Sequence, residues 1–287
     1  MSRVAVVVVT RNTREQLRTL LDGVRGAPDL IDEVVVVDND STDGTDELLA
    51  TRDSRPGHIV NRPGRGFAAG VNQGVRATSA TEVCIVTAST RLTAAAVRDL
   101  SRALNADGRI AAVAPLVRGL DGAVQRHGLF IPRPLTALVV LLGLERLGGP
   151  FRAEAARYYG RHEPGPAYDV DNISGACLLV RRAAWDAVGE FDERFFLYCE
   201  DVDWSLRARR AGWRLRFVPD VEVRREKSLA GRGDHSGTIR LYYRSLRAFY
   251  RKHYGGSRGR WLWLGGAYAR EGIELAIDRV TGRGLRY

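Results

Sequence analysis

Residues 4–13 read Val-Ala-Val-Val-Val-Val-Thr-Arg-Asn-Thr. The run of mostly β-branched residues predicts a buried strand that ends where the polar residues begin. Apolar residues then recur at helical spacing between positions 17 and 24, and residues 34–37 form a second apolar run. Fully apolar strands alternating with helices indicate a mostly parallel sheet covered on both faces, so the sequence predicts an α/β fold.

Polar residues follow both predicted strands. In open sheets of this kind, ligands bind at the carboxyl ends of the strands. We therefore expect binding residues after each strand. The Asp38 carboxylate suits hydrogen bonds from a nucleobase or ribose, whereas residues 41–45 suit turn and helix-cap chemistry. The residues expected at this edge are Thr10, Arg11, Asn12, Asp38 and Asn39.

A second polar cluster follows an aromatic run. Residues 195–204 read Phe-Phe-Leu-Tyr-Cys-Glu-Asp-Val-Asp-Trp. Carboxylates beside apolar neighbours have raised pKa values, which makes Glu200 or Asp201 a candidate general base. The alternative is an ordinary helix start, in which acidic residues complement the helix dipole ahead of an arginine-rich turn.

Four motifs in order resemble the signatures of family 2 inverting glycosyltransferases, and most closely the rhamnosyltransferase-like subgroup. They occupy residues 35–45, 61–72, 174–182 and 189–203, and the resemblance covers roughly residues 3–254. It implies a GT-A fold, a Rossmann-like nucleotide-binding sheet flanked by helices. It also implies transfer of a sugar, a deoxysugar such as rhamnose among the candidates, from a nucleotide-diphosphate-sugar, most simply a dTDP- or UDP-sugar, with inversion.

The resemblance also implies roles for individual residues. Asp38 matches the residue that holds the base, Thr10 lines the same pocket, and Asp201, next to Glu200, matches the catalytic base. The glycine-rich loop at 64–70 is expected to lie on the donor side, opening the helix that carries Asn72. Arg65 and Gly66 of this loop are expected near the diphosphate. The residues expected on the acceptor side are Ser174, Gly175, Tyr198 and Trp204.

The sequence departs from the family pattern at two related positions. Where the family carries a carboxylate that binds a divalent metal, this chain has Thr87-Ala-Ser89, and Arg225 replaces a second ligand, a histidine. Hydroxyls bind Mg²⁺ poorly and a guanidinium repels it, so we expect no protein metal site of the usual kind, although the sequence leaves Mg²⁺ or Mn²⁺ use open. The candidates for neutralising the diphosphate are Arg91, Arg224, Arg225 and Lys227.

Length and charge predict one catalytic domain with an extension. The chain has 287 residues, and from Trp204 onward 20 Lys+Arg face 7 Asp+Glu, a net charge of +13, against −3 for the preceding residues. We assign residues 1–235 to the catalytic domain, with a donor half of about 1–115 and an acceptor half of about 116–235. Residues 236–287 form a basic, amphipathic helical extension.

The basic extension predicts an anionic partner. No nucleic-acid-binding motif is present, whereas Trp261 and Trp263 beside arginines favour a membrane interface. The apolar stretch at residues 135–144 is too short to cross a bilayer, so it either packs as a helix or contacts lipid. We therefore expect a cytoplasmic protein that binds peripherally to the membrane. The expected acceptor is a hydroxyl on a lipid-linked molecule, and a homodimer is compatible with the sequence.

Two other functions are compatible with parts of the pattern. A catalytically silent nucleotide-sugar-binding partner or regulator would explain Ser89 and Arg225, but not the retained Glu200 and Asp201. A nucleotidyltransferase would require a glycine-rich, lysine-containing loop after the first strand, which is missing. The three cysteines lack the paired spacing of a metal site, which predicts buried, reduced thiols.

Overall fold

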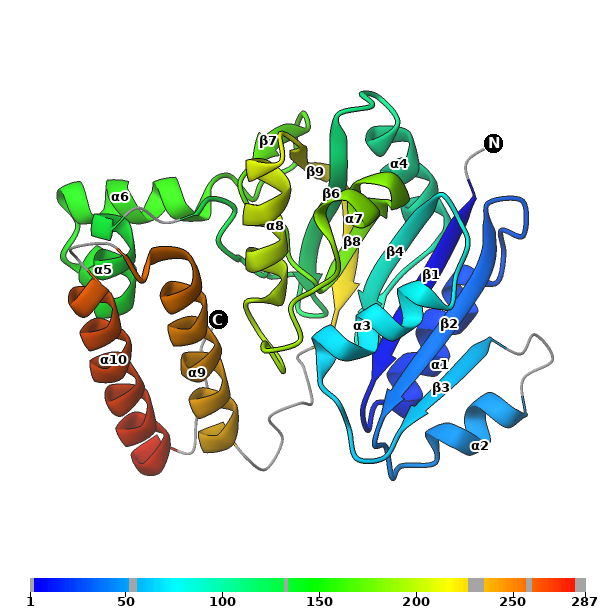
Figure 1. Cartoon of the computed structure of the whole chain (residues 1–287), viewed down its shortest axis with the longest axis horizontal. Helices are drawn as coiled ribbons and strands as arrows, with labels where there is room; N and C mark the ends of the chain where they lie inside the picture. Colours follow the sequence, from blue (N-terminus) through cyan, green and yellow to red (C-terminus); the bar gives the residue numbers. More distant parts are fainter. Residues whose placement is uncertain (1–2, 52–55, 132–133, 227–234, 257–259, 282–287) are drawn as a thin grey trace.

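The computed structural model describes residues 3–51, 56–131, 134–226, 235–256 and 260–281. Within these residues, nine strands form one mixed sheet in the order β3-β2-β1-β4-β8-β6-β9-β5, with β7 beside β9. Helices cover the sheet, and a separate group of helices lies at one end of the molecule (Figure 1). The predicted α/β architecture is confirmed.

The strands are β1 (Val4–Thr10), β2 (Ile31–Asn39), β3 (Gly57–Asn61), β4 (Glu82–Thr87), β5 (Thr90–Arg91), β6 (Ile110–Gly119), β7 (Tyr168–Val170), β8 (Cys177–Arg181) and β9 (Arg214–Arg225). The helices are α1 (Arg14–Val24), α2 (Thr45–Ala50), α3 (Phe67–Arg76), α4 (Ala94–Leu104), α5 (Pro134–Leu142), the 3-10 helix η1 (Leu144–Leu147), α6 (Gly149–Tyr159), α7 (Arg182–Val188), α8 (Glu200–Arg210), α9 (His235–Tyr254) and α10 (Arg260–Thr281).

The four strands β3, β2, β1 and β4 run parallel, so their carboxyl ends meet at one edge. Thr10 of β1 lies directly opposite Asp38 of β2. The strand β8 then runs antiparallel between β4 and β6, and β9 runs parallel to β6. This reversal places the loop before β8 and the end of β9 close to the end of β4.

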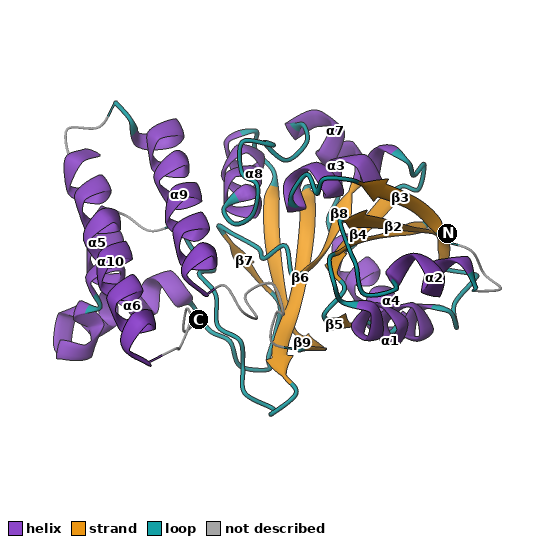
Figure 2. Cartoon of the chain, turned by 90° about the horizontal axis from the view of Figure 1, so that it is seen from below, coloured by secondary structure: helices purple, strands orange, loops and turns teal. Residues whose placement is uncertain are grey.

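Alternate side chains of β1 pack into two cores. Val4, Val6 and Val8 join α1, α2 and α4 on one face, while Val7 and Val9 join α3, α7 and α8 on the other. Figure 2 shows the two helical layers on either side of the sheet. Because both faces are covered, the strands are apolar throughout, as the sequence pattern predicts. Cys84, Cys177 and Cys199 are free and buried.

The helices α5, α6, α9 and α10 pack together at one end of the molecule (Figures 1 and 2). A third core joins Leu141 of α5, Tyr250 of α9 and Ala267 of α10 to Phe195 and Cys199 beside α8. The apolar stretch at 135–144 therefore forms a helix that packs on α10, and the helical end of the molecule includes part of the predicted acceptor half. No helix in the described ranges is long and apolar enough to cross a bilayer.

Candidate active site

The loops after β1 and β2 are joined by hydrogen bonds. The Asn12 backbone N–H donates to Ser41 Oγ at 2.9 Å, and the Thr42 N–H donates to Asn12 Oδ1 at 2.8 Å. Thr10 is buried and its hydroxyl lies 2.7 Å from the Thr13 hydroxyl, whereas Arg11 is exposed. The carboxyl ends of the two strands thus form one fixed edge, as the topology requires.

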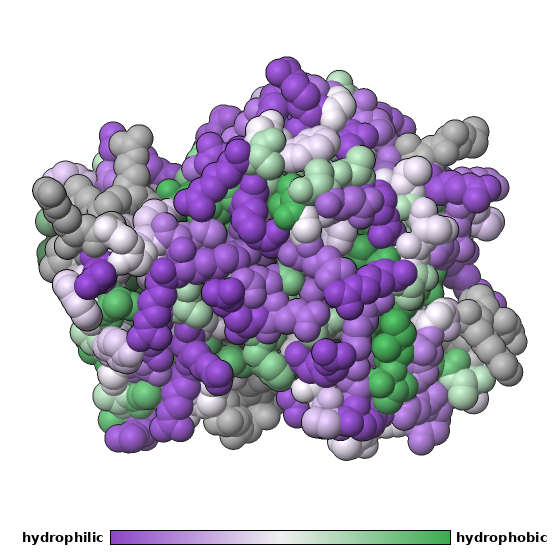
Figure 3. Space-filling model, viewed as in Figure 1, coloured by the Kyte–Doolittle hydropathy of each residue, from purple (hydrophilic) through white to green (hydrophobic). Residues whose placement is uncertain are grey.

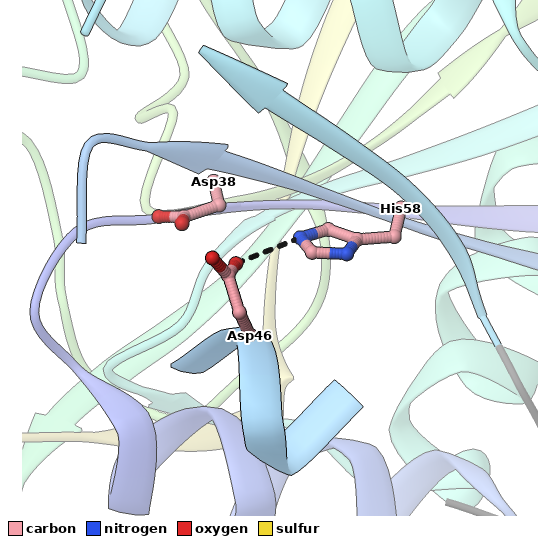
Figure 4. A group of neighbouring side chains, drawn as sticks. All are labelled: Asp38, Asp46 and His58. Carbon is pink, nitrogen blue, oxygen red and sulfur yellow. Dashed lines mark ion pairs between the residues drawn. The ribbon is translucent and has the colours of Figure 1, made fainter. Parts of the chain in front are cut away.

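Asp38 lies at this edge with its side chain fully buried. Its carboxylate accepts hydrogen bonds from the N–H and hydroxyl of Ser41 and from Arg62, whose Nη2 is 3.0 Å away. Arg62 also pairs with Asp46 at 3.1 Å, and His58 lies 3.5 Å from Asp46. Figure 4 shows Asp46 between Asp38 and His58.

These three side chains, Asp38, Asp46 and His58, have ligand atoms close enough for one metal ion. However, the guanidinium of Arg62 already bridges the two carboxylates, and these carboxylates raise its pKa. A divalent cation at the same place would face a fixed positive charge. We therefore assign this cluster to shaping the base pocket. Sequence reasoning missed Arg62, which directly follows β3, because this short and mostly exposed strand lacks the apolar run that revealed β1 and β2.

Asn39 connects the strand edge to the glycine-rich loop. Its amide donates to the Gly66 carbonyl at 2.7 Å, and its oxygen accepts from Asn61 and from the Arg65 N–H. Gly66 has φ of +89°, and a Cβ atom there would lie 2.4 Å from the Phe196 carbonyl oxygen. The loop is thus held against the aromatic run that precedes the predicted catalytic residues. Asn39 acts by positioning this loop.

Asn72 does not contribute to the donor site in the way the sequence suggested. Its amide donates to the Phe191 carbonyl at 2.9 Å, and its oxygen accepts from the Phe191 N–H at 3.0 Å. The side chain is buried, and it also contacts Glu193. Because both polar atoms hold the 191–193 loop, we remove Asn72 from the donor-binding set. The Arg65 side chain, for its part, lies 3.7 Å from Glu193.

Asp201 is held at the start of α8, facing the loop before β8. One of its oxygens accepts from the Gly175 N–H at 2.7 Å, and the other accepts from the Val202 N–H at 2.8 Å. Burial raises the pKa of Asp201, although the backbone hydrogen bonds oppose this rise. The predicted acceptor-side Gly175 is therefore in direct contact with the predicted base, and Ser174 precedes it.

Glu200 has a different environment from its neighbour. It is buried, and one of its oxygens has no hydrogen-bond partner among the described residues. Burial, together with the charge of Asp201, raises the pKa of Glu200 well above its ordinary value. Of the two carboxyl groups, Glu200 is thus the one whose surroundings favour the neutral form more strongly.

The backbone before these carboxylates is strained. Tyr198 and Cys199 have φ values of +70° and +68°, in the left-handed region that side chains other than glycine rarely adopt. Such conformations cost about 1–3 kcal/mol each and cluster at functional sites. The Tyr198 ring packs edge-on against Tyr242 of α9, and Ser245 of α9 donates to the Leu197 carbonyl at 2.7 Å. The helical extension thus supports the strained segment.

Trp204 was expected on the acceptor side, and this expectation is wrong. Its indole is buried, stacks on Trp185, and donates to the Gly189 carbonyl at 2.9 Å. The side chain therefore belongs to the core beneath α8.

Ser89 and Arg225 lie together at the end of β4, as their paired departure from the family pattern suggested. Arg225 Nε donates to Ser89 Oγ at 3.3 Å, and the Thr87 hydroxyl lies 3.3 Å from the same oxygen. Burial lowers the pKa of Arg225, and Tyr198 is a near neighbour. The site at the end of β4 thus contains two hydroxyls and a guanidinium.

The other diphosphate candidates have different surroundings. Arg91 pairs with Glu226 at 3.1 Å, and that carboxylate also accepts from Gln16 at 3.0 Å. Arg224 is exposed on β9. Lys227 lies outside the described residues. Among the described candidates, Arg225 alone is half-buried beside Ser89.

Asp203 is a buried anchor that sequence reasoning treated only as part of a helix start. Its carboxylate accepts from Arg207 at 2.9 Å, from His253 at 2.7 Å and from Lys252 at 2.6 Å. Burial raises its pKa, but these hydrogen bonds outweigh burial and lower the pKa to about 2. Lys252 and His253 belong to α9, so this cluster fastens the extension to the helix that carries Asp201.

Comparison with known proteins agrees with this geometry. Residues 5–188 match the family described as glycosyl transferase family 2, and residues 159–277 match glycosyl transferase family group 2. The chain is 30% identical, over 259 residues, to the N-acetylglucosaminyl-diphospho-decaprenol L-rhamnosyltransferase of Mycobacterium tuberculosis, covering 85% of this chain and 82% of the relative.

Solved structures show the same fold. A mannosyltransferase from Pyrobaculum calidifontis, in complex with GDP-Man and Mn²⁺, aligns with a TM-score of 0.61 and 20% identity over 99% of this chain and 76% of that one. GalNAc-T7 with UDP, GalNAc and Mn²⁺ aligns with a TM-score of 0.61 and 16% identity over 98% and 58%.

The fold and the site define a nucleotide-sugar-dependent transferase of the GT-A class. The chain belongs to glycosyl transferase family 2, in its rhamnosyltransferase-like part. It is an enzyme that moves a sugar from a nucleotide sugar to an acceptor with inversion, so the catalytically silent and nucleotidyltransferase alternatives are set aside.

Proposed function

We propose that this enzyme transfers a deoxyhexose, rhamnose in the simplest case, from a dTDP- or UDP-sugar to a hydroxyl of a lipid-linked acceptor. The observation that carries the proposal is the Asp201 carboxylate, fixed by the Gly175 and Val202 backbone N–H groups. The choice of sugar and acceptor rests on the rhamnosyltransferase of Mycobacterium tuberculosis, whose name specifies a decaprenol-linked acceptor.

The reaction is a single displacement. The acceptor oxygen attacks the anomeric carbon on the face opposite the leaving diphosphate, and the acceptor proton moves to Asp201. Each Asp201 oxygen accepts one backbone hydrogen bond, so a lone pair remains free to take the proton. A raised pKa brings the carboxylate closer to the operating pH, where a general base is most effective.

A cavity of about 390 Å³ lies on the acceptor half and supports binding there. Its lining includes Phe130, Tyr158, Glu154 and Arg157. The lining combines apolar side chains with charged ones, which can fix the orientation of a bound ligand. We assign this cavity to the acceptor sugar.

A lipid-linked acceptor requires contact with a membrane, and α10 supplies a fitting surface. Glu271 of this helix pairs with Arg247 of α9, and Arg270 pairs with Glu274. Some of its apolar residues, Trp263 and Ala267 among them, pack against the protein, and others are exposed. The exposed apolar residues of α10 are Trp261, Tyr268, Ile273, Ile277 and Val280, which we call the α10 apolar face. Figure 3 shows hydrophobic side chains reaching the surface at this end of the molecule.

Arginines border this face, which favours an anionic lipid surface. Arg260 lies over the Trp261 ring at 4.8 Å, and Arg251 lies 3.5 Å from the Tyr268 hydroxyl. Arg240 and Arg244 are exposed on α9. The two tryptophans do not act together, because Trp263 is buried and stacks on Tyr254. Only Trp261 is available to the interface.

The proposed transfer can be tested with a short-chain prenyl-diphosphate-linked sugar as acceptor and a panel of nucleotide sugars as donors. We expect turnover with a dTDP- or UDP-deoxyhexose, and a product whose anomeric configuration by NMR is opposite to that of the donor. Asp201→Asn should keep the melting temperature and lower turnover by at least ~10²-fold. A product of retained configuration, or near-normal turnover in this variant, would contradict the mechanism.

A further inference from the structure

The site around Ser89 does not fit a divalent metal ion. Such ions prefer several oxygen ligands, usually including carboxylates. Here the polar groups are the hydroxyls of Ser89 and Thr87 and the guanidinium of Arg225. The Glu226 backbone N–H donates to the Ser89 carbonyl at 2.9 Å, but the Glu226 carboxylate is engaged with Arg91 and Gln16. In this respect the site differs from one suited to Mn²⁺, the ion present in the mannosyltransferase and GalNAc-T7 complexes.

Arg225 is a cation without an ion-pair partner in the part of the chain that the structure describes. Its guanidinium donates to a neutral hydroxyl, and burial lowers its pKa. The surroundings therefore give the charged guanidinium little stabilisation. By contrast, Arg62, Arg65 and Arg91 on neighbouring segments all pair with carboxylates. A half-buried cation of this kind gains stability when an anion binds beside it.

The position of Arg225 identifies that anion. Its strand β9 pairs with β5, so the guanidinium reaches the end of β4. Tyr198, which is followed by the Glu200 and Asp201 pair, is near enough to influence the pKa of Arg225. The cation therefore lies at the end of β4 in the neighbourhood of the segment that leads to the proposed base. In a displacement reaction the leaving diphosphate occupies the place between these two parts.

We propose that Arg225 replaces the divalent cation, binding the donor diphosphate and stabilising it as it leaves. This inference rests on the proposed sugar transfer and specifies its leaving-group machinery. As the acceptor oxygen bonds to the anomeric carbon, the bond from that carbon to the β-phosphate oxygen breaks. The bonding electron pair stays on the phosphate oxygen, and the guanidinium neutralises the added negative charge while the acceptor proton moves to Asp201.

Binding of the free nucleoside diphosphate tests the proposal independently of turnover. In excess EDTA, wild-type affinity measured by calorimetry should equal the affinity in Mg²⁺ or Mn²⁺. Arg225→Ala should weaken it at least ~10-fold, the scale of a lost charge-assisted hydrogen bond. Arg216→Ala is the matched control, because Arg216 lies on the same strand and pairs with Asp169 at 3.1 Å. It should bind as the wild type does.

Turnover provides the second readout. Wild-type turnover should persist in EDTA, and Arg225→Ala should lose ~10²-fold or more, the effect typical of removing one donor to a developing negative charge. Added guanidinium ion should restore part of that turnover, which a merely structural role would not predict. If Arg225→Ala does not fold, Arg225→Gln and Arg225→Lys make the same comparison, with Lys retaining more activity.

A double substitution tests the exchange of arginine for metal directly. Ser89→Asp with Arg225→His introduces a carboxylate and an imidazole at adjoining positions, and should make nucleoside diphosphate binding depend on Mn²⁺. Loss of wild-type turnover in EDTA with recovery in Mg²⁺ or Mn²⁺ would overturn the proposal. So would unchanged diphosphate affinity in Arg225→Ala. If no donor supports turnover but diphosphate still binds in EDTA through Arg225, the transfer proposal fails while the arginine site stands.

Discussion

Asp201 and Glu200 are adjacent in sequence, yet the structure gives them different chemistry. The Asp201 carboxylate is held by two backbone N–H groups, which stabilise its charged form, whereas Glu200 is buried with an unpartnered oxygen. Both pKa values are raised by burial, but that of Glu200 is raised well above its ordinary value. These environments favour the charged form more at Asp201, the proposed base, than at Glu200, a difference that paired catalytic carboxylates commonly use.

The first prediction concerns Glu200→Gln and its pH dependence. A carboxyl with a raised folded-state pKa holds more protons folded than unfolded, so its contribution to stability falls as pH rises from its ordinary value through its folded value. Replacing Glu200 with the neutral amide of glutamine removes this loss of stability at higher pH. We therefore expect the melting temperature of Glu200→Gln to rise relative to that of the wild type as the pH increases above ~4.3. A difference that stays constant across that range would mean that Glu200 does not change protonation on folding.

The second prediction concerns the base pocket. Asp38→Asn should weaken binding of the nucleoside diphosphate by roughly 1–3 kcal/mol, because a charged hydrogen-bond acceptor is lost. Asp99→Asn is the control for the same chemical change, since Asp99 lies on α4, pairs with Arg102 and has 48% of its side chain accessible. Calorimetry at constant ionic strength measures both. Equal affinity of Asp38→Asn and the wild type would reduce Asp38 to a loop-shaping residue.

At the scale of elements, the sequence predicted the strands and site loops because they follow simple rules. Apolar runs become strands, and polar residues at their carboxyl ends meet at one edge, so Thr10 and Asp38 lie opposite each other. Asn72 and Trp204 could not be placed in this way. Whether a helical side chain faces the site or the neighbouring loop depends on how the helix is rotated, which their local sequence does not encode.

The contact between α8 and α9 also could not be predicted from the sequence. Asp203 and the pair Lys252 and His253 are almost 50 positions apart, and only the folded chain brings them within hydrogen-bond distance. The predicted amphipathic pattern is present in α9, whose buried residues lie on the side that packs on the protein. The apolar spacing of α9 could not identify α8 as its partner, because such spacing shows which face of a helix is buried but not which part of the protein covers it.

The third prediction concerns this α8–α9 contact. Asp203→Asn should lower the free energy of unfolding by about 3 kcal/mol, because breaking a buried ion pair leaves its partners poorly compensated. It should also reduce turnover, since Asp203 lies two residues after the base. Glu190→Gln, which breaks the exposed pair with Arg76, is the control and should cost less than ~1 kcal/mol. Equal costs for the two changes would remove Asp203 as an anchor.

The wild-type stability carried by Asp203 has a defined pH dependence. Its folded pKa of about 2 lies below the ordinary aspartate value, so its contribution is present above that value and is lost as pH falls toward 2. The free energy of unfolding of Asp203→Asn should therefore approach that of the wild type as the pH falls toward 2. This trend is opposite in sign to that expected for Glu200, so the two variants serve as controls for each other.

For the whole molecule, the distribution of charge and apolar surface is asymmetric. The residues from Trp204 onward carry a net charge of +13, whereas the preceding residues carry −3. The α10 apolar face lies within this basic region, and Glu271 of α10 pairs with Arg247 of α9. Exposed apolar side chains on a helix favour contact with a partner surface, and the bordering arginines make an anionic bilayer the best match.

The last prediction tests that surface. The protein should co-sediment with liposomes that contain anionic phospholipid at low salt and be released as ionic strength rises, because screening weakens the attraction. Ile273→Ser with Ile277→Ser should reduce binding at all salt concentrations, since burial of each apolar side chain contributes about 1.5–3 kcal/mol. Arg240→Gln with Arg244→Gln should mainly reduce the salt-sensitive part, at roughly 1 kcal/mol per arginine. Leu120→Ser, a change at an exposed leucine distant in sequence from α10, should have no effect. Equal binding to neutral liposomes would contradict the electrostatic contribution, and a concentration-dependent dimer that the isoleucine variants abolish would instead assign the α10 apolar face to a second copy of the chain.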